Sequence, residues 1–93
     1  MKIYTFNRND LKWAEDYYAL IQKTMHLPEW FGKNADALWD MLTGYIETPC
    51  QIELIGFNKK ENKYNEQVIN KINSCFKDAE KEFPKLFKVI EKY

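Results

Sequence analysis

The stretch LPEWFGKNADALWDMLTGYIETP, residues 27–49, predicts a loop followed by a short helix. Pro28 and Gly32 are typical loop residues, and two large aromatic side chains lie between them. Asn34 is a favourable N-cap residue, because its side-chain oxygen can accept a hydrogen bond from a backbone N–H of the first turn. Gly44 is typical of the position just beyond a helix C-terminus, so we expect this helix to cover residues 34–43.

Outward from this stretch, hydrophobic periodicity predicts three strands and two more helices. The expected elements in chain order are a strand over residues 2–6, a helix from Asn9 or Asp10 to about Thr24, the helix over 34–43, a strand over 51–57, a polar connection over 58–64, a helix ended by Pro84, and a strand over 86–91. The first helix carries an apolar stripe of Leu11, Ala14, Tyr18, Ile21 and Met25, and the last is marked by Val68, Ile72, Cys75, Phe76, Ala79 and Phe83.

Strands that are separated by helices favour parallel pairing with right-handed crossovers, because parallel neighbours need a long connection. We therefore expect an α/β fold with a three-stranded, mostly parallel sheet packed with helices, in the order β-α-α-β-α-β. A chain of 93 residues can bury enough surface for one core, so residues 1–93 are expected to form a single domain.

The distribution of charge is more informative than its total. The formal net charge is zero, which argues against a nonspecific nucleic-acid binder. Between residues 26 and 48, however, four acids stand against one lysine, whereas residues 59–93 contain nine lysines and six acids. The chain thus has one acidic segment within a neutral whole.

The N-terminus has no apolar stretch typical of a signal peptide, and no run of 18 apolar residues suggests a membrane span, so we expect a cytoplasmic protein. Cys50 and Cys75 have neither CxxC nor Cys/His spacing, which predicts two reduced, packed thiols.

Two aspartates give the predicted helix over residues 34–43 an acidic outer face. On a helical wheel Asp36, Asp40 and Thr43 fall within about 60° of one another, with the apolar positions on the opposite side. Like charges at i and i+4 disfavour a helix slightly, so this pair does not serve helix stability. An ordinary solvated face remains the simplest alternative. The flanking aromatics Trp30, Phe31 and Tyr45 favour a protein interface instead.

Catalysis is a weaker interpretation of the same residues. Two carboxylates one turn apart on a convex helix face lack the burial that would separate their pKa values, and they form no pocket. His26 is the only histidine, and no triad, metal-ligand or phosphate-loop spacing surrounds it. We expect no enzyme, no cofactor and no metal.

Residues 27–49 also resemble the signature of the barstar family of ribonuclease inhibitors. The resemblance rests on the LPE loop, the aromatic pair before Gly32, the NxDALWDxLTG helix and the aromatic Tyr45. The expected order of strands and helices agrees with the parallel α/β fold of that family. The resemblance implies an intracellular inhibitor of a basic, secreted, guanyl-type ribonuclease, free as a monomer and binding neither nucleic acid nor membrane. A module for another cationic toxin or protein is the alternative.

The resemblance also implies roles for individual residues. Asp36 and Asp40 would enter the ribonuclease groove where RNA phosphates bind. The other implied contacts are rim hydrogen bonds from Asn34, Thr43 and Gly44, apolar contacts from Trp30, Phe31 and Tyr45, and an outlying acid at Asp78.

Overall fold

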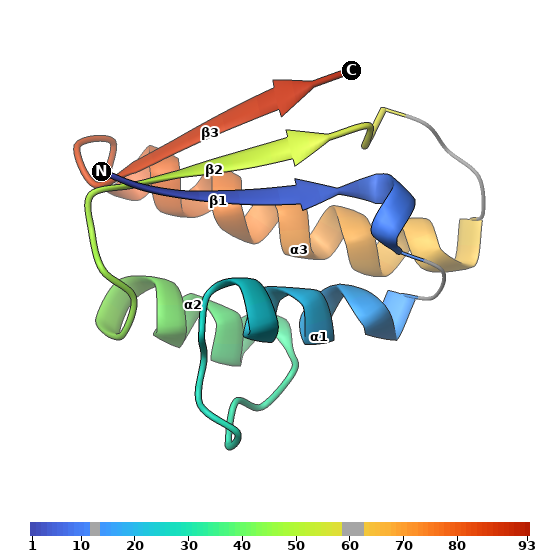
Figure 1. The fold of residues 1–93 in the computed structure, drawn as a ribbon, viewed down its shortest axis with the longest axis horizontal. Coiled ribbons are helices and arrows are strands. Elements are labelled where there is room, and N and C mark those ends of the chain that lie inside the picture. Colours follow the sequence, from blue (N-terminus) through green and yellow to red (C-terminus); the bar gives the residue numbers. More distant parts are fainter. Residues whose placement is uncertain (12–13, 59–62) are drawn as a thin grey trace.

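The computed structural model describes residues 1–11, 14–58 and 63–93, and within them all side chains except those of residues 14–16 and 63–65. The elements in chain order are β1 (Lys2–Asn7), the 3₁₀ helix η1 (Arg8–Asp10), α1 (Ala14–Thr24), α2 (Ala35–Gly44), β2 (Cys50–Ile55), α3 (Lys63–Glu82) and β3 (Phe87–Lys92). The strands form one sheet in the order β1-β2-β3, and both neighbouring pairs are parallel (Figure 1). The predicted α/β class and element order are confirmed.

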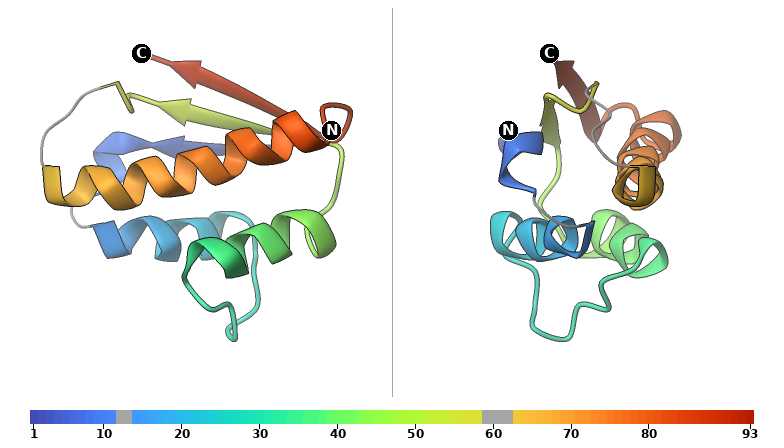
Figure 2. Two further views of the ribbon diagram at one scale, coloured as in Figure 1. Left: turned by 180° about the vertical axis from the view of Figure 1, so that it is seen from behind. Right: turned by 90° about the vertical axis from the view of Figure 1, so that its right-hand side faces the viewer.

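The helices cover one face of the sheet. Figure 2 shows α1, α2 and α3 to the same side of the three strands. Burial alternates along the strands accordingly, with Tyr4 and Phe6 of β1 and Cys50, Ile52 and Leu54 of β2 buried. The residues between them point to the uncovered face.

Aromatic side chains from three elements form the centre of the core. Phe6 of β1 stacks on Phe76 of α3 with ring centroids 5.6 Å apart, and Tyr17 of α1 lies 5.9 Å from Phe6. Tyr17 is fully buried, and its hydroxyl donates to Oδ1 of Asn73 on α3. Of the predicted stripe, Leu11, Ile21 and Met25 are buried, whereas Tyr18 is half-buried at the edge of the core. Tyr17, which the stripe did not include, is fully buried instead.

The start of the first helix differs from the prediction. The predicted N-cap at Asn9 or Asp10 is wrong, because residues 8–10 form η1, which Asn7 caps by accepting from the Asn9 N–H at 2.9 Å. Leu11 precedes α1 in an extended conformation and is nevertheless buried. The positions directly before α1, residues 12–13, lie outside the described residues.

The remaining boundaries differ by a few residues at most. α3 ends at Glu82, two residues before Pro84, and its buried apolar side chains among the described residues are Ile69, Ile72, Cys75, Phe76 and Ala79. Of the marker residues, Val68 is only partly buried and Phe83 lies beyond the helix, 38% exposed. The predicted connection over 58–64 overlaps the start of α3, and residues 59–62 lie outside the described ones.

Both cysteines are free and buried, as predicted. Burial raises the pKa of the Cys50 and Cys75 thiols to about 11, so both stay protonated at neutral pH and are poor nucleophiles.

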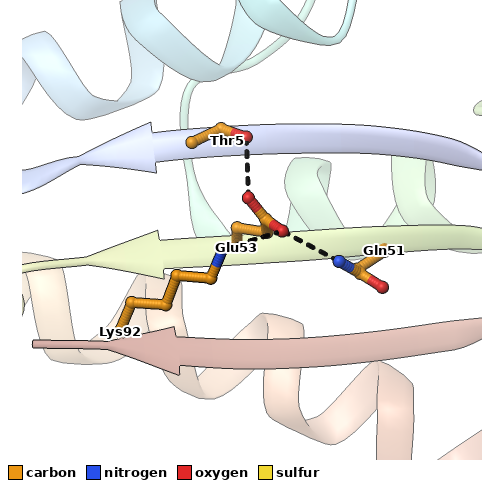
Figure 3. Close-up of polar contacts among 4 residues, drawn as sticks. All are labelled: Thr5, Gln51, Glu53 and Lys92. Atoms are coloured by element: carbon orange, nitrogen blue, oxygen red, sulfur yellow. Dashed lines mark hydrogen bonds and ion pairs between the residues drawn. The ribbon is translucent and has the colours of Figure 1, made fainter.

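A polar network joins the three strands on the uncovered face (Figure 3). Glu53 of the central strand accepts hydrogen bonds from Thr5 Oγ1 at 3.2 Å, from Gln51 Nε2 at 2.9 Å and from Lys92 Nζ at 3.3 Å. The hydrogen bond from Lys92 is the main cause that lowers the pKa of Glu53 below its ordinary value, and burial acts in the opposite direction. Glu53 thus links both edge strands to the centre.

We predict that Glu53→Gln removes a pH-dependent part of the stability. A carboxyl whose folded-state pKa is lowered stabilises the fold above its unfolded pKa of about 4.3, and this contribution is lost as the pH falls through the folded-state pKa. The difference in free energy of unfolding between wild type and variant should therefore be larger at neutral pH than in acid. Urea denaturation at several pH values measures it; a difference that does not change with pH contradicts the prediction.

Candidate protein-binding surface

Local chemistry fixes the N-terminus of α2. Asn34 is extended, and its Oδ1 accepts from the Ala37 N–H at 2.8 Å, which confirms the predicted N-cap. Its Nδ2 donates to the Gly32 carbonyl at 2.7 Å, so the same side chain joins the loop to the helix. Both ends of the Asn34 amide are therefore engaged within the chain, which reduces what it can offer to a partner.

We predict that Asn34→Ala lowers the free energy of unfolding by about 1 kcal/mol, because an N–H of the first turn of α2 loses its acceptor. Asn34→Ser is the matched control, since serine also caps and should retain most of the stability. Chemical denaturation of the three proteins measures the effect. Equal losses for alanine and serine would contradict a capping role.

The C-terminus of α2 lies one residue later than expected. Gly44 is the last helical residue and not the residue after the helix, and the Tyr45 N–H closes the turn by donating to the Met41 carbonyl at 3.0 Å. No other heavy atom would lie within 4 Å of a Cβ at Gly44, so its surface is open for the close approach of another molecule.

Asp36, Asp40 and Thr43 form the outer face of α2, here called the acidic face. All three are exposed, whereas the side chains on the opposite side of the helix are buried, namely Leu38, Met41 and Leu42. Thr43 Oγ1 donates to the Trp39 carbonyl at 2.8 Å, which leaves the hydroxyl oxygen free to accept a hydrogen bond. The wheel prediction for this helix is confirmed.

The two aspartates of the acidic face have no cationic partner among the side chains that the structure describes. The ion pairs in that part of the chain join Lys77 to Glu91 at 2.6 Å and Lys92 to Glu53 at 3.3 Å, away from α2. Asp36 and Asp40 are thus neighbouring exposed carboxylates without an ion-pair partner among the described side chains, an arrangement that a cationic ligand would relieve, although Lys71 lines the same hollow as Asp36.

Two aromatic side chains border the acidic face. Trp30 of the loop is 71% exposed and Tyr45 is 51% exposed, and their rings meet edge to face with centroids 6.5 Å apart. A pair of exposed rings beside charged groups is typical of a binding surface.

Phe31 does not belong to this surface, and its expected contact with a partner needs correction. It is only 4% exposed, and its ring packs against Tyr18 of α1 with centroids 6.4 Å apart. A turn in which the Phe31 N–H donates to the Pro28 carbonyl at 3.0 Å sends this side chain inward, while Trp30 projects outward.

The fold brings Asp78 of α3 next to Asp36 of α2. Both line an open hollow between these helices, together with Trp39, Lys71 and the edge of Cys75. The charges of Asp78 and Asp36 add to burial in raising the pKa of the Cys75 thiol, which reflects this proximity. Trp39 could have been found from the sequence, because it lies three residues after Asp36, but no sequence signal indicated Lys71.

The described residues show neither a catalytic nor a metal-binding arrangement. Within them no group of three or more His, Cys, Asp and Glu side chains could hold a metal ion. In the same ranges no helix is long and apolar enough to cross a membrane.

Two comparisons relate the chain to known proteins. The family model described as "Barstar (barnase inhibitor)" matches residues 1–91. A protein of Bacillus subtilis (strain 168) named "Putative ribonuclease inhibitor YrdF" is 29% identical over 70 residues, which cover 75% of this chain and 76% of that protein. The chain therefore belongs to the barstar family.

Proposed function

We propose that the protein inhibits a secreted, guanyl-type ribonuclease by placing its acidic face in the cationic active-site groove. Inhibition of a ribonuclease follows at the level of the family, whose description is barnase inhibitor, and the printed name of the relative agrees with it. The observation that carries the proposal is the pair of exposed carboxylates, Asp36 and Asp40, which have no cationic partner among the described side chains.

The chemistry of a ribonuclease groove suits this pair. Such a groove holds phosphates with Arg, Lys and His side chains, and a carboxylate can accept charge-assisted, bidentate hydrogen bonds from the same donors. Asp36 and Asp40 would occupy phosphate positions, and Asp78 could approach the same cationic group as Asp36 because both border one hollow. Inhibition would then be steric exclusion of RNA, with no reaction performed by the inhibitor.

The remaining surface residues would complete the contact. Trp30 and Tyr45 offer exposed rings, and the Thr43 hydroxyl oxygen and the open backbone at Gly44 offer hydrogen-bonding groups at the rim. We further propose that the protein acts inside the cell, as a monomer when free, and protects its host from a toxic nuclease.

A titration against a panel of secreted microbial ribonucleases, with RNA cleavage as the readout, tests the proposal. We expect stoichiometric inhibition of at least one basic enzyme, and loss of inhibition for the Asp36→Asn/Asp40→Asn variant. If no enzyme of the panel is bound or inhibited at micromolar inhibitor, the proposal is contradicted. That outcome would favour the alternative, a module for another cationic toxin or protein.

The effect of salt on this complex should be moderate. We predict that added salt weakens binding mainly by slowing association, because the attraction between exposed charges is screened over about 10 Å at 0.1 M ionic strength. The formal net charge is zero, so the slope should be shallower than for a strongly acidic inhibitor. Stopped-flow association rates across a salt series measure it, and a rate independent of salt contradicts an electrostatic interface.

A further inference from the structure

A second hollow lies beside the acidic face, at the end of α2. Its volume is about 80 Å³. The residues around it are mostly apolar and include Leu42, Thr43, Ile46, Phe83, Leu86 and Phe87. Phe83 and Leu86 are 38% and 39% exposed, although apolar side chains of this size are usually buried when the chain itself can cover them. Among the described residues, nothing fills the space that they border.

The position of this hollow connects it to the proposed interface. Thr43 belongs both to its wall and to the acidic face. On the opposite side, Phe83 follows the C-terminus of α3, five residues after Asp78, which corresponds to roughly 7.5 Å of helix. The acidic hollow at Asp36 and Asp78 and the apolar hollow at Thr43 and Phe83 therefore follow one another along the boundary between α2 and α3.

We infer that the apolar hollow receives one aliphatic side chain of the partner, next to the cationic groove that takes the aspartates; this inference rests on the proposed function. The size of the hollow favours a small occupant, because a closed cavity of about 150 Å³ binds benzene and this hollow has about half that volume. A side chain such as Val or Leu suits the space better than an aromatic ring.

This contact would determine which cationic enzyme is bound. Charge complementarity steers the acidic face towards cationic clefts and disfavours partners of like charge, but two basic enzymes with similar charges in the groove both satisfy it. An apolar side chain seated in a pocket next to the charges adds a requirement of shape. The preferred target is then a ribonuclease with an exposed aliphatic residue at the border of its groove.

The variant Phe83→Ser/Leu86→Asn tests the inference, because it makes the hollow polar without changing a charge. Against a ribonuclease that the panel shows to be inhibited, we expect the Kd to rise about 10- to 100-fold, as for the loss of one buried aliphatic contact. The rise should come from faster dissociation, and the salt dependence of association should stay as in wild type. If the double variant does not fold, the single variant Leu86→Asn replaces it in the same measurement.

Ile3→Asn is the matched control, since Ile3 is 55% exposed on the uncovered face of the sheet, the face opposite the helices, and should leave the Kd unchanged. A Kd for the double variant within twofold of wild type, with the fold intact, overturns the inference but leaves the proposed function standing.

A measurement on the free protein separates the two proposals further. Isobutanol serves as an aliphatic probe in an NMR titration, and we expect shift changes at Thr43, Ile46 and Leu86 that the double variant lacks. Such changes support the hollow as an aliphatic site even if no ribonuclease is inhibited, a result that would refute the proposed function alone. No change at these residues overturns the inference.

Discussion

Replacing Asp40 with alanine should weaken the complex with the target ribonuclease by about 2–5 kcal/mol or more, the loss typical of a charged hydrogen-bonding partner removed from a buried interfacial pair. Most of this loss arises in the enzyme, because its Arg or Lys side chains remain buried without the anion that replaced RNA phosphate. The stability of the inhibitor itself should hardly change, since Asp40 is exposed and forms no ion pair with a described side chain. Inhibition titrations and thermal unfolding of the same samples measure the two effects.

Glu47→Ala is the matched control for this prediction. Glu47 is also an exposed acid of the same segment, but it lies beyond α2 and outside the acidic face. Both variants remove one negative charge, so both should slow association to a similar small extent. Only Asp40→Ala should accelerate dissociation. If Asp40→Ala inhibits as well as wild type, Asp40 does not enter the groove and the proposed arrangement is wrong.

The fold could be predicted from the sequence because its determinants are local or periodic. Alternating strand and helix signals limit the topology to a parallel sheet with crossovers, and the structure has that order. Asn34 could be identified as an N-cap because capping depends on one side chain and the backbone three residues on. The start of α1 could not be predicted in this way, because residues 8–10 form an unexpected 3₁₀ turn.

The candidate site could be predicted only in part, because local spacing places residues of one helix but not residues that are distant in sequence. The acidic face follows from helical spacing, so Asp36, Asp40 and Thr43 were placed together without knowledge of the fold. Asp78 is 42 residues from Asp36 in sequence, and only the packing of α3 against α2 brings the two to one hollow. No spacing rule reaches across such a separation, and the resemblance to a known family supplied Asp78 instead.

Trp30 and Phe31 show a further limit, because a loop has no periodicity that tells inward from outward side chains. Adjacent in sequence, they are 71% and 4% exposed. The loop is held to α1 by Phe31 packing on Tyr18 and by Gln22 Nε2, which donates to the Pro28 carbonyl at 2.8 Å. Phe31 thus belongs to folding and Trp30 to the surface.

This division predicts that the two alanine variants lower the stability by very different amounts. Phe31→Ala should lower the free energy of unfolding by about 3–5 kcal/mol, because it leaves a cavity in the core beneath the loop. Trp30→Ala should lower it by about 1 kcal/mol or less, since the edge contact with Tyr45 is its main interaction. Urea denaturation measures both values.

Affinity for the target should follow the reverse order once folding is taken into account. Measured at a temperature where both variants are fully folded, Trp30→Ala should weaken the complex by about 1–3 kcal/mol, because it removes an exposed aromatic contact beside the aspartates. Phe31→Ala should weaken the complex less, and only because the loop becomes looser. Phe31→Leu should restore the affinity, because leucine refills most of the cavity and holds the loop in place. A direct contact of Phe31 with the enzyme would require this ring to leave the core on binding. In that case Phe31→Ala would weaken the folded complex more than Trp30→Ala, and the assignment of the two rings would have to be reversed.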